Sequence, residues 1–141
     1  MITLQFSTTK GVGSQVIRWA TWSPYSHVDL VLDDGRLLGA TARYGVSIRD
    51  PEPIQTYARF QVSGSVETIE AARSQIGRPY DWPGILGWGF RRNWQDQNAW
   101  FCSELIAWAF EQAGCPLLRG DRSHRITPRD LLLSPALIPV S

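Results

Sequence analysis

The chain has 141 residues, of which 43% are hydrophobic, and its 14 Lys and Arg residues nearly balance its 13 Asp and Glu residues. This length suits one domain with a substantial core, and a net charge of +1 provides no basic surface for nucleic acid or an anionic membrane. No apolar run is long enough to span a bilayer, and residues 1–6 lack the basic and apolar regions of a signal peptide. We therefore expect a single domain over residues 1–141 that is synthesised in the cytoplasm, with its final site left open.

The chain begins with a predicted strand followed by a predicted helix. Residues 2–6 alternate between apolar and polar side chains, which is typical of a strand. Residues 14–22 follow a turn of Gly-Val-Gly, begin with Ser14 as a candidate N-cap and end before Pro24. This second segment is predicted to form a short helix.

The next segment predicts a β-hairpin that carries a histidine and an aspartate. Residues 25–33 and 36–41 read as strands, and the Asp-Asp-Gly sequence between them suits a three-residue loop with its glycine in the left-handed conformation. Alternation along the first strand places His27 and Asp29 on the same face. This loop length also sets which residues face each other across the hairpin. The facing pairs are His27 with Thr41 and Asp29 with Gly39.

Two further strands, a helix and a long loop follow. The strands are predicted at residues 45–49 and 55–62, and the helix at residues 66–76 with Ser65 as its N-cap. Residues 78–98 are rich in Gly, Pro and Trp and have no clear period, so we expect a long ordered loop.

Residues 100–114 predict a helix with Cys102 in its first turn and Gly114 just beyond its end. Unpaired N–H groups and the positive end of the helix dipole favour a thiolate at such a position. The same residue is also compatible with a buried structural cysteine, because free Cys is often buried. Cys115 lies beyond the other end of this helix, roughly 20 Å away at about 1.5 Å per residue, which is too far for a disulfide between the two.

A last helix start lies near the C-terminus. Thr127 is a candidate N-cap, Pro128 occupies the first helical position, and Asp130 follows at the third. Two cysteines and two histidines at the spacings of this chain make a poor zinc site, so no metal and no cofactor are expected.

Several of these segments together resemble a known family. Residues 76–82 (IGRPYDW) and 100–105 (WFCSEL) resemble the NlpC-type papain-fold thiol hydrolases, in which a Gly-x-x-Tyr segment precedes a helix that begins with the nucleophilic cysteine. His27 precedes the cysteine, and this order resembles the circularly permuted branch, the YaeF/YiiX-type proteins, which are also similar to lecithin–retinol acyltransferases. Residues 127–131 fit this branch. The resemblance extends over about residues 14–133 and implies an α+β fold of papain-like type in permuted order, with a small antiparallel sheet packed against the cysteine-bearing helix.

The resemblance implies a mechanism for these residues. Cys102 would attack a carbonyl carbon, and His27 would pair with the thiolate and then protonate the leaving group. The backbone N–H of Cys102 would stabilise the oxyanion, with the Tyr80 hydroxyl as a second donor. Tyr80, Trp82 and Ser103 are assigned to oxyanion and substrate binding. His124, in a polar stretch, is expected at the surface.

The chain departs from this branch at one position. The histidine strand of the branch usually reads His-x-Gly, and the next strand supplies a Glu-Ala step whose carboxylate orients the histidine. Here Gly39 stands at the position of that glutamate, and Asp29 stands at the position of the usual glycine. Asp29 and Thr41 are therefore the two candidates for orienting His27, and a solvated Asp29 is the alternative.

Three functions agree with these residues. The leading hypothesis is a thiol hydrolase of amide bonds, with cell-wall peptide (peptidoglycan) as the expected substrate. The second is an acyltransferase or a lipid or ester hydrolase that uses the same acyl-thioester. The third is a non-catalytic binding or structural module, such as a component of a phage particle. The expected partner is a peptide or acyl substrate, and the oligomeric state is left open.

Overall fold

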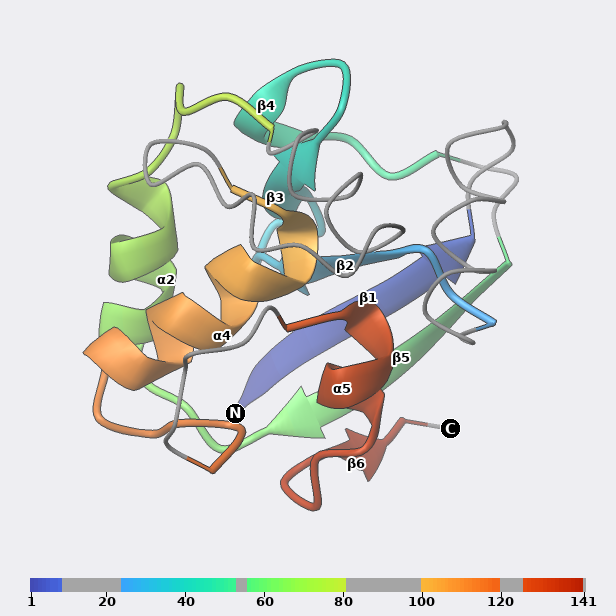
Figure 1. Cartoon of the computed structure of the whole chain (residues 1–141), viewed down its shortest axis with the longest axis vertical. Helices are drawn as coiled ribbons and strands as arrows, with labels where there is room; N and C mark the ends of the chain where they lie inside the picture. The colour runs from blue at the N-terminus through green and yellow to red at the C-terminus, as the bar shows by residue number, and fades with distance from the viewer. Residues whose placement is uncertain (9–23, 53–55, 81–99, 120–125, 141) are drawn as a thin grey trace, which may run out of the picture.

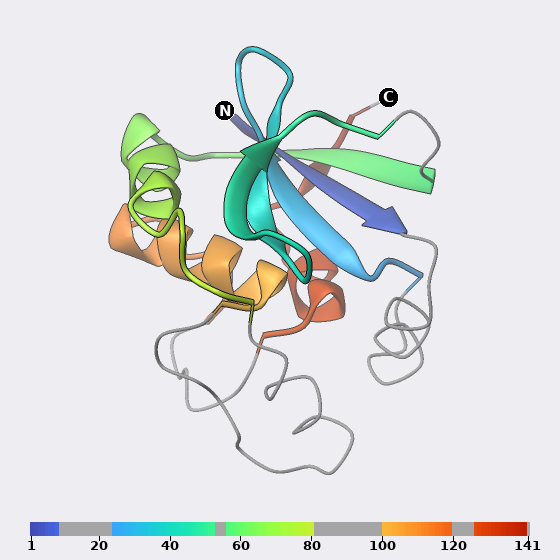
Figure 2. The same cartoon turned by 90° about the horizontal axis from the view of Figure 1, so that it is seen from above.

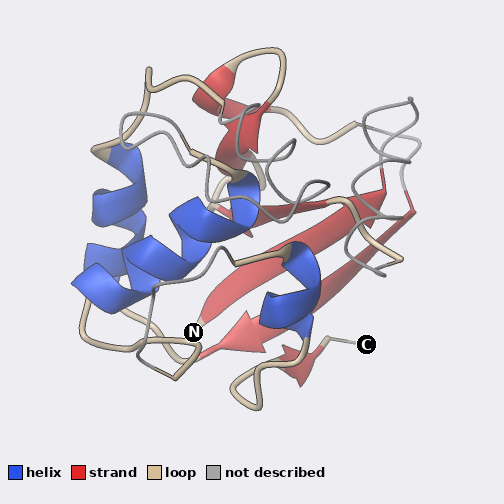
Figure 3. Ribbon diagram, viewed as in Figure 1, coloured by secondary structure: helices blue, strands red, loops and turns tan. Residues whose placement is uncertain are grey.

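The computed structural model describes residues 1–8, 24–52, 56–80, 100–119 and 126–140, and it shows an α+β fold. Six strands form one sheet, and the helices that it describes pack against that sheet (Figures 1 and 3). The predicted helix at residues 14–22 and nearly all of the predicted loop at residues 78–98 lie outside the described residues. The strands are β1 (Ile2–Thr8), β2 (His27–Val31), β3 (Leu37–Thr41), β4 (Gly45–Arg49), β5 (Thr56–Val62) and β6 (Ile138–Pro139), and the helices are α2 (Val66–Arg73), α4 (Cys102–Gln112) and α5 (Pro128–Leu132).

The sheet has the strand order β4-β3-β2-β1-β5-β6, and all its neighbouring strands are antiparallel. The N-terminal strand β1 therefore lies inside the sheet, between β2 and β5. Its polar residues Gln5 and Ser7 are as buried as its apolar ones, with exposures of 3% and 1%. β6 was not predicted from the sequence, because a strand of two residues shows no alternation. Its proline lies at the edge of the sheet, where a missing N–H is tolerated.

The β2–β3 hairpin has the predicted three-residue loop. The Leu32 N–H donates to the Arg36 carbonyl at 2.8 Å and the Gly35 N–H to the Leu32 carbonyl at 2.9 Å, with Gly35 at φ 84°. The paired residues are Leu30 with Leu38 and Val31 with Leu37, which is the register that this loop length predicts. The prediction of register is confirmed, and it follows from turn geometry alone.

The core lies between one face of the sheet and helix α4. Phe6, Leu30 and Leu38 are fully buried on this face, and they share a hydrophobic cluster with Leu105 and Phe110 of α4. Helix α2 lies beside α4 in both views of the chain (Figures 1 and 2). The predicted packing of an antiparallel sheet against the cysteine-bearing helix is what the structure has.

Helix α4 begins at Cys102. Phe101 is its N-cap in extended conformation (φ −86°, ψ 149°), so Cys102 is the first helical residue. Gly114, at φ 75°, follows its end, and the Cys115 N–H donates back to the Phe110 carbonyl at 3.0 Å. Both cysteines are free thiols, as predicted from their separation by the helix.

The segment in front of α4 is tied to the beginning of β4 by backbone hydrogen bonds. The Gly77 N–H donates to the Val46 carbonyl at 3.0 Å, and the Val46 N–H donates to the Arg78 carbonyl at 2.9 Å. The Trp100 N–H then donates to the Pro79 carbonyl at 2.9 Å. These bonds place the start of α4 at the β3–β4 end of the sheet, where Figure 2 shows the two curved strands close to it.

The two shorter helices follow their sequence signals to different degrees. Helix α5 has the predicted cap, because the Thr127 hydroxyl accepts from the Asp130 N–H at 3.2 Å and the Asp130 carboxylate accepts from the Thr127 N–H at 2.7 Å. Helix α2 is shorter than the predicted 66–76: it ends at Arg73, and turns continue to Gly77 at φ 96°. Within the described ranges, no helix combines the length and the apolar character that crossing a membrane requires.

Candidate functional site

Cys102 is completely buried at the N-terminus of α4. The first hydrogen bond of the helix runs from the Leu105 N–H to the Phe101 carbonyl, so the N–H of Cys102 belongs to the first turn, where helix geometry provides no acceptor. The positive end of the helix dipole lies at the same place. The start of α4 therefore offers a backbone donor and the positive end of the helix dipole to a negatively charged oxygen beside Cys102.

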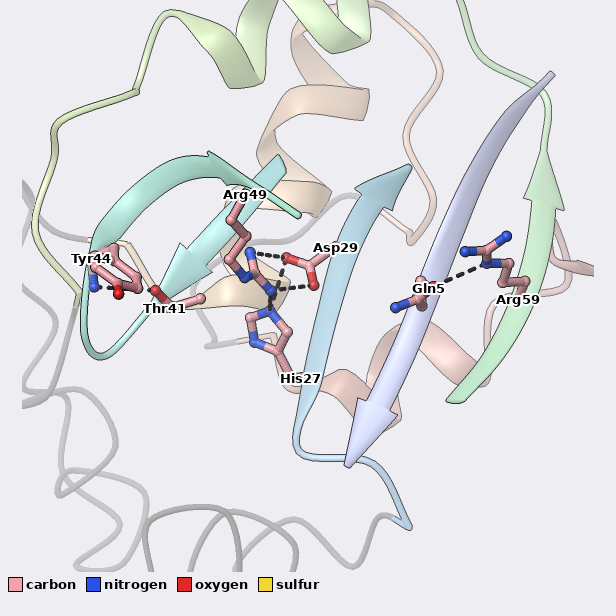
Figure 4. A network of polar contacts seen from close by, with 7 residues as sticks. All are labelled: Gln5, His27, Asp29, Thr41, Tyr44, Arg49 and Arg59. Atoms are coloured by element: carbon pink, nitrogen blue, oxygen red, sulfur yellow. Dashed lines mark hydrogen bonds and ion pairs between the residues drawn. The ribbon is translucent and has the colours of Figure 1, made fainter. Parts of the chain in front are cut away.

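His27 and Asp29 form a direct hydrogen bond. The two residues alternate along β2, and the imidazole Nε2 lies 2.8 Å from Asp29 Oδ1 (Figure 4). Same-face neighbours on a strand are about 7 Å apart at their backbones, so the side chains bridge this distance by leaning along the strand. Asp29 is fully buried and His27 is 7% exposed, which makes this an interior pair rather than a solvated one.

Gly39 provides the space for the Asp29 carboxylate. A Cβ atom at this position would overlap Asp29 Oδ1 and crowd its carboxyl carbon. Gly39 is also buried, on the strand beside Asp29. A larger residue at position 39 and a carboxylate at position 29 therefore exclude each other in this geometry.

Arg49, at the end of β4, is a member of the cluster that sequence analysis missed. Its Nη1 donates to Asp29 Oδ1 at 3.0 Å and its Nη2 to Asp29 Oδ2 at 2.6 Å (Figure 4). In Figure 4 the guanidinium, the carboxylate and the imidazole lie together between β2 and the β3–β4 hairpin. The signal that could have found it is the pairing of β4 with β3, in which Arg49 lies opposite Leu37, on the same sheet face as Gly39 and Asp29.

The cluster favours a charged histidine and a charged aspartate. Burial by itself lowers the pKa of His27, but the charges of Asp29 and Cys102 and its hydrogen bonds with both side chains outweigh burial and raise the pKa from 6.5 to about 10. Burial likewise raises the pKa of Asp29, and the charges and hydrogen bonds of His27 and Arg49 more than offset it, so that the pKa falls below 3.8. At neutral pH, His27 is an imidazolium and Asp29 a carboxylate.

These charge states settle the roles of the two ring nitrogens. A protonated Nε2 donates to Asp29, so Arg49 Nη2, which lies 3.0 Å from Nε2 and is itself a donor, bonds to the carboxylate instead. Nδ1 is then the ring nitrogen that remains to face the Cys102 side chain, which adds to the raised pKa of His27. The imidazole thus hydrogen-bonds the Asp29 carboxylate, and both Asp29 and Cys102 raise its pKa.

Thr41, the second candidate for orienting His27, has a different partner. Its hydroxyl accepts a hydrogen bond from the Tyr44 N–H at 3.2 Å in the turn between β3 and β4. The backbone pairing of β2 with β3 stops at Leu30 and Leu38, before it reaches Thr41. The predicted facing of His27 and Thr41 is therefore not part of the ladder, and Asp29 is the predicted partner that contacts the imidazole.

The three residues assigned to oxyanion and substrate binding lie in different surroundings. Ser103 is fully buried and its hydroxyl donates to the Ile126 carbonyl at 2.5 Å, so it ties α4 to the segment before α5, and its assigned role stays a prediction. Tyr80 is half-buried beside the start of α4, with its ring 5.6 Å from that of Phe101. Trp82, like His124, lies outside the described residues.

The chain is similar in fold to a solved structure and similar in sequence, over part of its length, to curated proteins. No protein-family model matches the chain. Its fold is that of the metalloprotein YiiX from Escherichia coli O157:H7, with a TM-score of 0.74 over 99% of this chain and 95% of that one, at 20% sequence identity. Over 49 residues, 35% of its length, the chain is 41% identical to proteins named probable endopeptidases from Mycobacterium tuberculosis and Mycobacterium bovis. It spans about a tenth of the length of these relatives.

Proposed function

We propose that this chain is a cysteine-dependent hydrolase of the YiiX/NlpC type, with Cys102 as nucleophile, His27 as general base and acid, and Asp29 as the group that orients His27. The observation that carries the proposal is the buried His27–Asp29 pair, in which Asp29 and then Cys102, at the N-terminus of α4, raise the pKa of the imidazole. A cysteine and a histidine oriented by a third polar group are the parts that thiol acyl chemistry needs. The permuted papain-like assignment belongs to this proposal, and the order of His27 before Cys102 supports it.

The reaction follows from these groups. The Cys102 thiolate attacks the carbonyl carbon of the substrate, and the carbonyl oxygen takes the negative charge. When the C–N bond breaks, His27 gives its proton to the leaving amine, and a thioester on Cys102 remains. His27, now neutral, removes a proton from water, which attacks the thioester; the acid leaves, and the thiolate and the imidazolium are restored.

The oxyanion in both steps needs hydrogen-bond donors. The backbone N–H of Cys102 is the first, because it belongs to the first turn of α4. The Tyr80 hydroxyl is the proposed second donor, since Tyr80 packs against Phe101, the residue before the nucleophile. Because the thiol is completely buried, substrate needs a path to it, and small electrophiles are the appropriate first probes.

The proposed substrate class is an amide bond in peptide, with cell-wall peptide as the first candidate. The similarity to proteins named probable endopeptidases supports a peptide substrate, although it covers 35% of this chain. Acyl transfer, or hydrolysis of a lipid or ester, would proceed through the same thioester and would differ only in what attacks it or in what it is formed from. Substrate trials therefore decide among these chemistries.

A metal at this cluster does not fit its residues. The name of YiiX describes that protein as a metalloprotein. In this chain, both oxygens of Asp29 accept hydrogen bonds from the Arg49 guanidinium, whose positive charge also opposes a cation at His27 Nε2. Among the described residues, no three His, Cys, Asp or Glu side chains converge as a metal site would require. The proposed reaction therefore has no step through a metal.

The proposal is tested by trapping the thioester. The purified chain is incubated with peptidoglycan fragments, with acyl esters and with lipids, quenched in acid, and analysed by intact and peptide mass spectrometry. The expected result is an acyl adduct on Cys102 that is absent from Cys102→Ala and still present in the matched variant Cys115→Ala. Which substrate forms the adduct identifies the chemistry, and turnover that survives Cys102→Ala would refute a cysteine-dependent hydrolase.

A further inference from the structure

The cluster around His27 contains more charge than a catalytic pair requires. The charged or titratable groups that bear on the imidazole come from three elements: Asp29 on β2, Arg49 on β4 and Cys102 at the start of α4. A thiolate and a carboxylate are two negative charges, whereas His27 supplies one positive charge. Unbalanced charge in an interior is costly, because the lost hydration is not replaced.

We infer that Arg49 is a positioning residue for this site: its fork fixes the Asp29 carboxylate against His27, and its charge completes a neutral group of four in which the thiolate and the imidazolium coexist. The inference rests on the proposed function for the thiolate state of Cys102. Two parallel N–H···O bonds set the plane of a carboxylate as a single contact does not.

The contacts of Asp29 support the positioning part. Within the described chain, the hydrogen bonds to its carboxylate come from His27 at 2.8 Å and from Arg49 at 3.0 and 2.6 Å. Arg49 holds both oxygens, and Oδ1 is the one shared with His27. The Arg49 side chain is only 24% exposed, so the pair is largely protected from screening by water. Without Arg49 the carboxylate would keep one partner and could rotate away from the imidazole.

The charge balance makes three variants respond differently. Without Arg49, the thiolate, the carboxylate and the imidazolium together carry one excess negative charge. This excess is removed most simply if the Cys102 thiol keeps its proton. Without Asp29 the group carries an excess positive charge, which does not oppose a thiolate. With both residues neutralised, the imidazolium and the thiolate again balance each other. Asp29→Asn should therefore suppress the defect of Arg49→Met.

The measurement is the rate at which iodoacetamide alkylates Cys102 as a function of pH, in a Cys115→Ala background that leaves one thiol. We expect Arg49→Met to lower the rate at neutral pH about tenfold and to move the profile about one unit to higher pH. Arg49→Lys should retain most of the rate because it keeps the charge, and the double variant Asp29→Asn/Arg49→Met should return close to the parent rate.

Arg59 offers a matched control. It is also half-buried on this sheet, and its Nε donates to Gln5 Oε1 at 3.0 Å, but it lies on β5, away from His27 (Figure 4). Arg59→Met should leave the alkylation rate and its pH profile unchanged. Thermal melts monitored by circular dichroism verify that each variant is folded.

Two outcomes would overturn the inference: an unchanged pH profile in Arg49→Met, or a double variant that reacts no faster than Arg49→Met alone. If Arg49→Met does not fold, Arg49→Lys and the double variant Asp29→Asn/Arg49→Met test the inference in its place. A double variant that fails to fold or loses its reactivity then refutes the charge balance. Alkylation needs no substrate, so it separates the two proposals: a chain that shows the suppression and forms no acyl adduct would refute the hydrolase and retain the role of Arg49.

Discussion

A cysteine lies at each end of helix α4, and the two cysteines differ in their position on the helix, in their burial and in the groups beside them. Cys102 begins the helix, is completely buried and contributes, with Asp29, to the raised pKa of His27. Cys115 follows the other end, is half-buried, and has the Thr68 hydroxyl as its neighbour at 3.8 Å. The helix dipole favours a negative charge at the first site and opposes one at the second. The comparison shows that position on one helix, and not residue type, distinguishes a candidate nucleophile from a packing residue.

The sharpest way to test what distinguishes the Cys102 end is to remove the carboxylate behind His27. Asp29→Asn should lower kcat/KM on the trapped substrate by on the order of a thousandfold, because the amide no longer holds the imidazole in the orientation that turnover requires. Thr41→Val is the matched control and should have little effect, since its hydroxyl serves the β3–β4 turn. If Asp29→Asn left kcat/KM unchanged and Thr41→Val strongly lowered it, Thr41 and not Asp29 would be the residue that orients His27.

A direct comparison of the two thiols gives the next largest effect. Limited iodoacetamide treatment, followed by peptide mass spectrometry, should modify Cys102 on the order of a hundredfold faster than Cys115, because thiolate fraction governs alkylation. The burial of Cys102 works against this result, so the experiment also measures how readily the site admits a small reagent. Preferential modification of Cys115 would break the comparison between the two ends.

Gly39→Ala tests the steric requirement behind the site. The added Cβ would overlap Asp29 Oδ1, so we expect the Asp29 carboxylate to shift partly away from His27 and activity to fall by about tenfold, with a loss of stability of about 1–3 kcal/mol for the overpacked position. Gly35→Ala is a control with a different cause: its Cβ meets open space but its φ of 84° is strained, so it should affect stability without affecting activity. Equal activity losses in both variants would contradict a specific role for Gly39.

The smallest expected effect is the pH dependence of stability. The folded pKa of His27 lies above its unfolded value of 6.5, so its contribution is complete below pH 6.5 and is lost as the pH rises toward about 10. Asp29 has the opposite sign: its lowered pKa contributes above 3.8 and is lost on acidification. The difference in stability between the parent and His27→Gln, measured by thermal melts, should therefore shrink as the pH rises from 6.5 toward about 10. The expected decrease is at least about 1 kcal/mol, or about 2–4 °C in Tm. Parallel curves would contradict the raised pKa.

Much of the local structure could be predicted from the sequence because local geometry determines it. The Asp-Asp-Gly loop set the register of β2 and β3, and Thr127 with Asp130 marked the start of α5. Gly114 marked the end of α4, and alternation put His27 and Asp29 on one face. Turns, caps and alternation depend on neighbours within a few residues, so a single sequence carries them.

The remainder of the site depends on residues brought together by the sheet. Arg49 reaches Asp29 only because β4 folds back along β3, and the Ser103 hydroxyl has its hydrogen-bond partner in the chain before α5. The tertiary structure also determines that Asp29 and not Thr41 contacts His27. β2 and β3 stop pairing before His27, and Gly39 makes room for the carboxylate. The sequence by itself determined which side chains could carry the chemistry and where the strands and helices holding them begin. Only the tertiary structure decided which of them are in contact, because the energies of burial and charge pairing depend on elements that are distant along the chain.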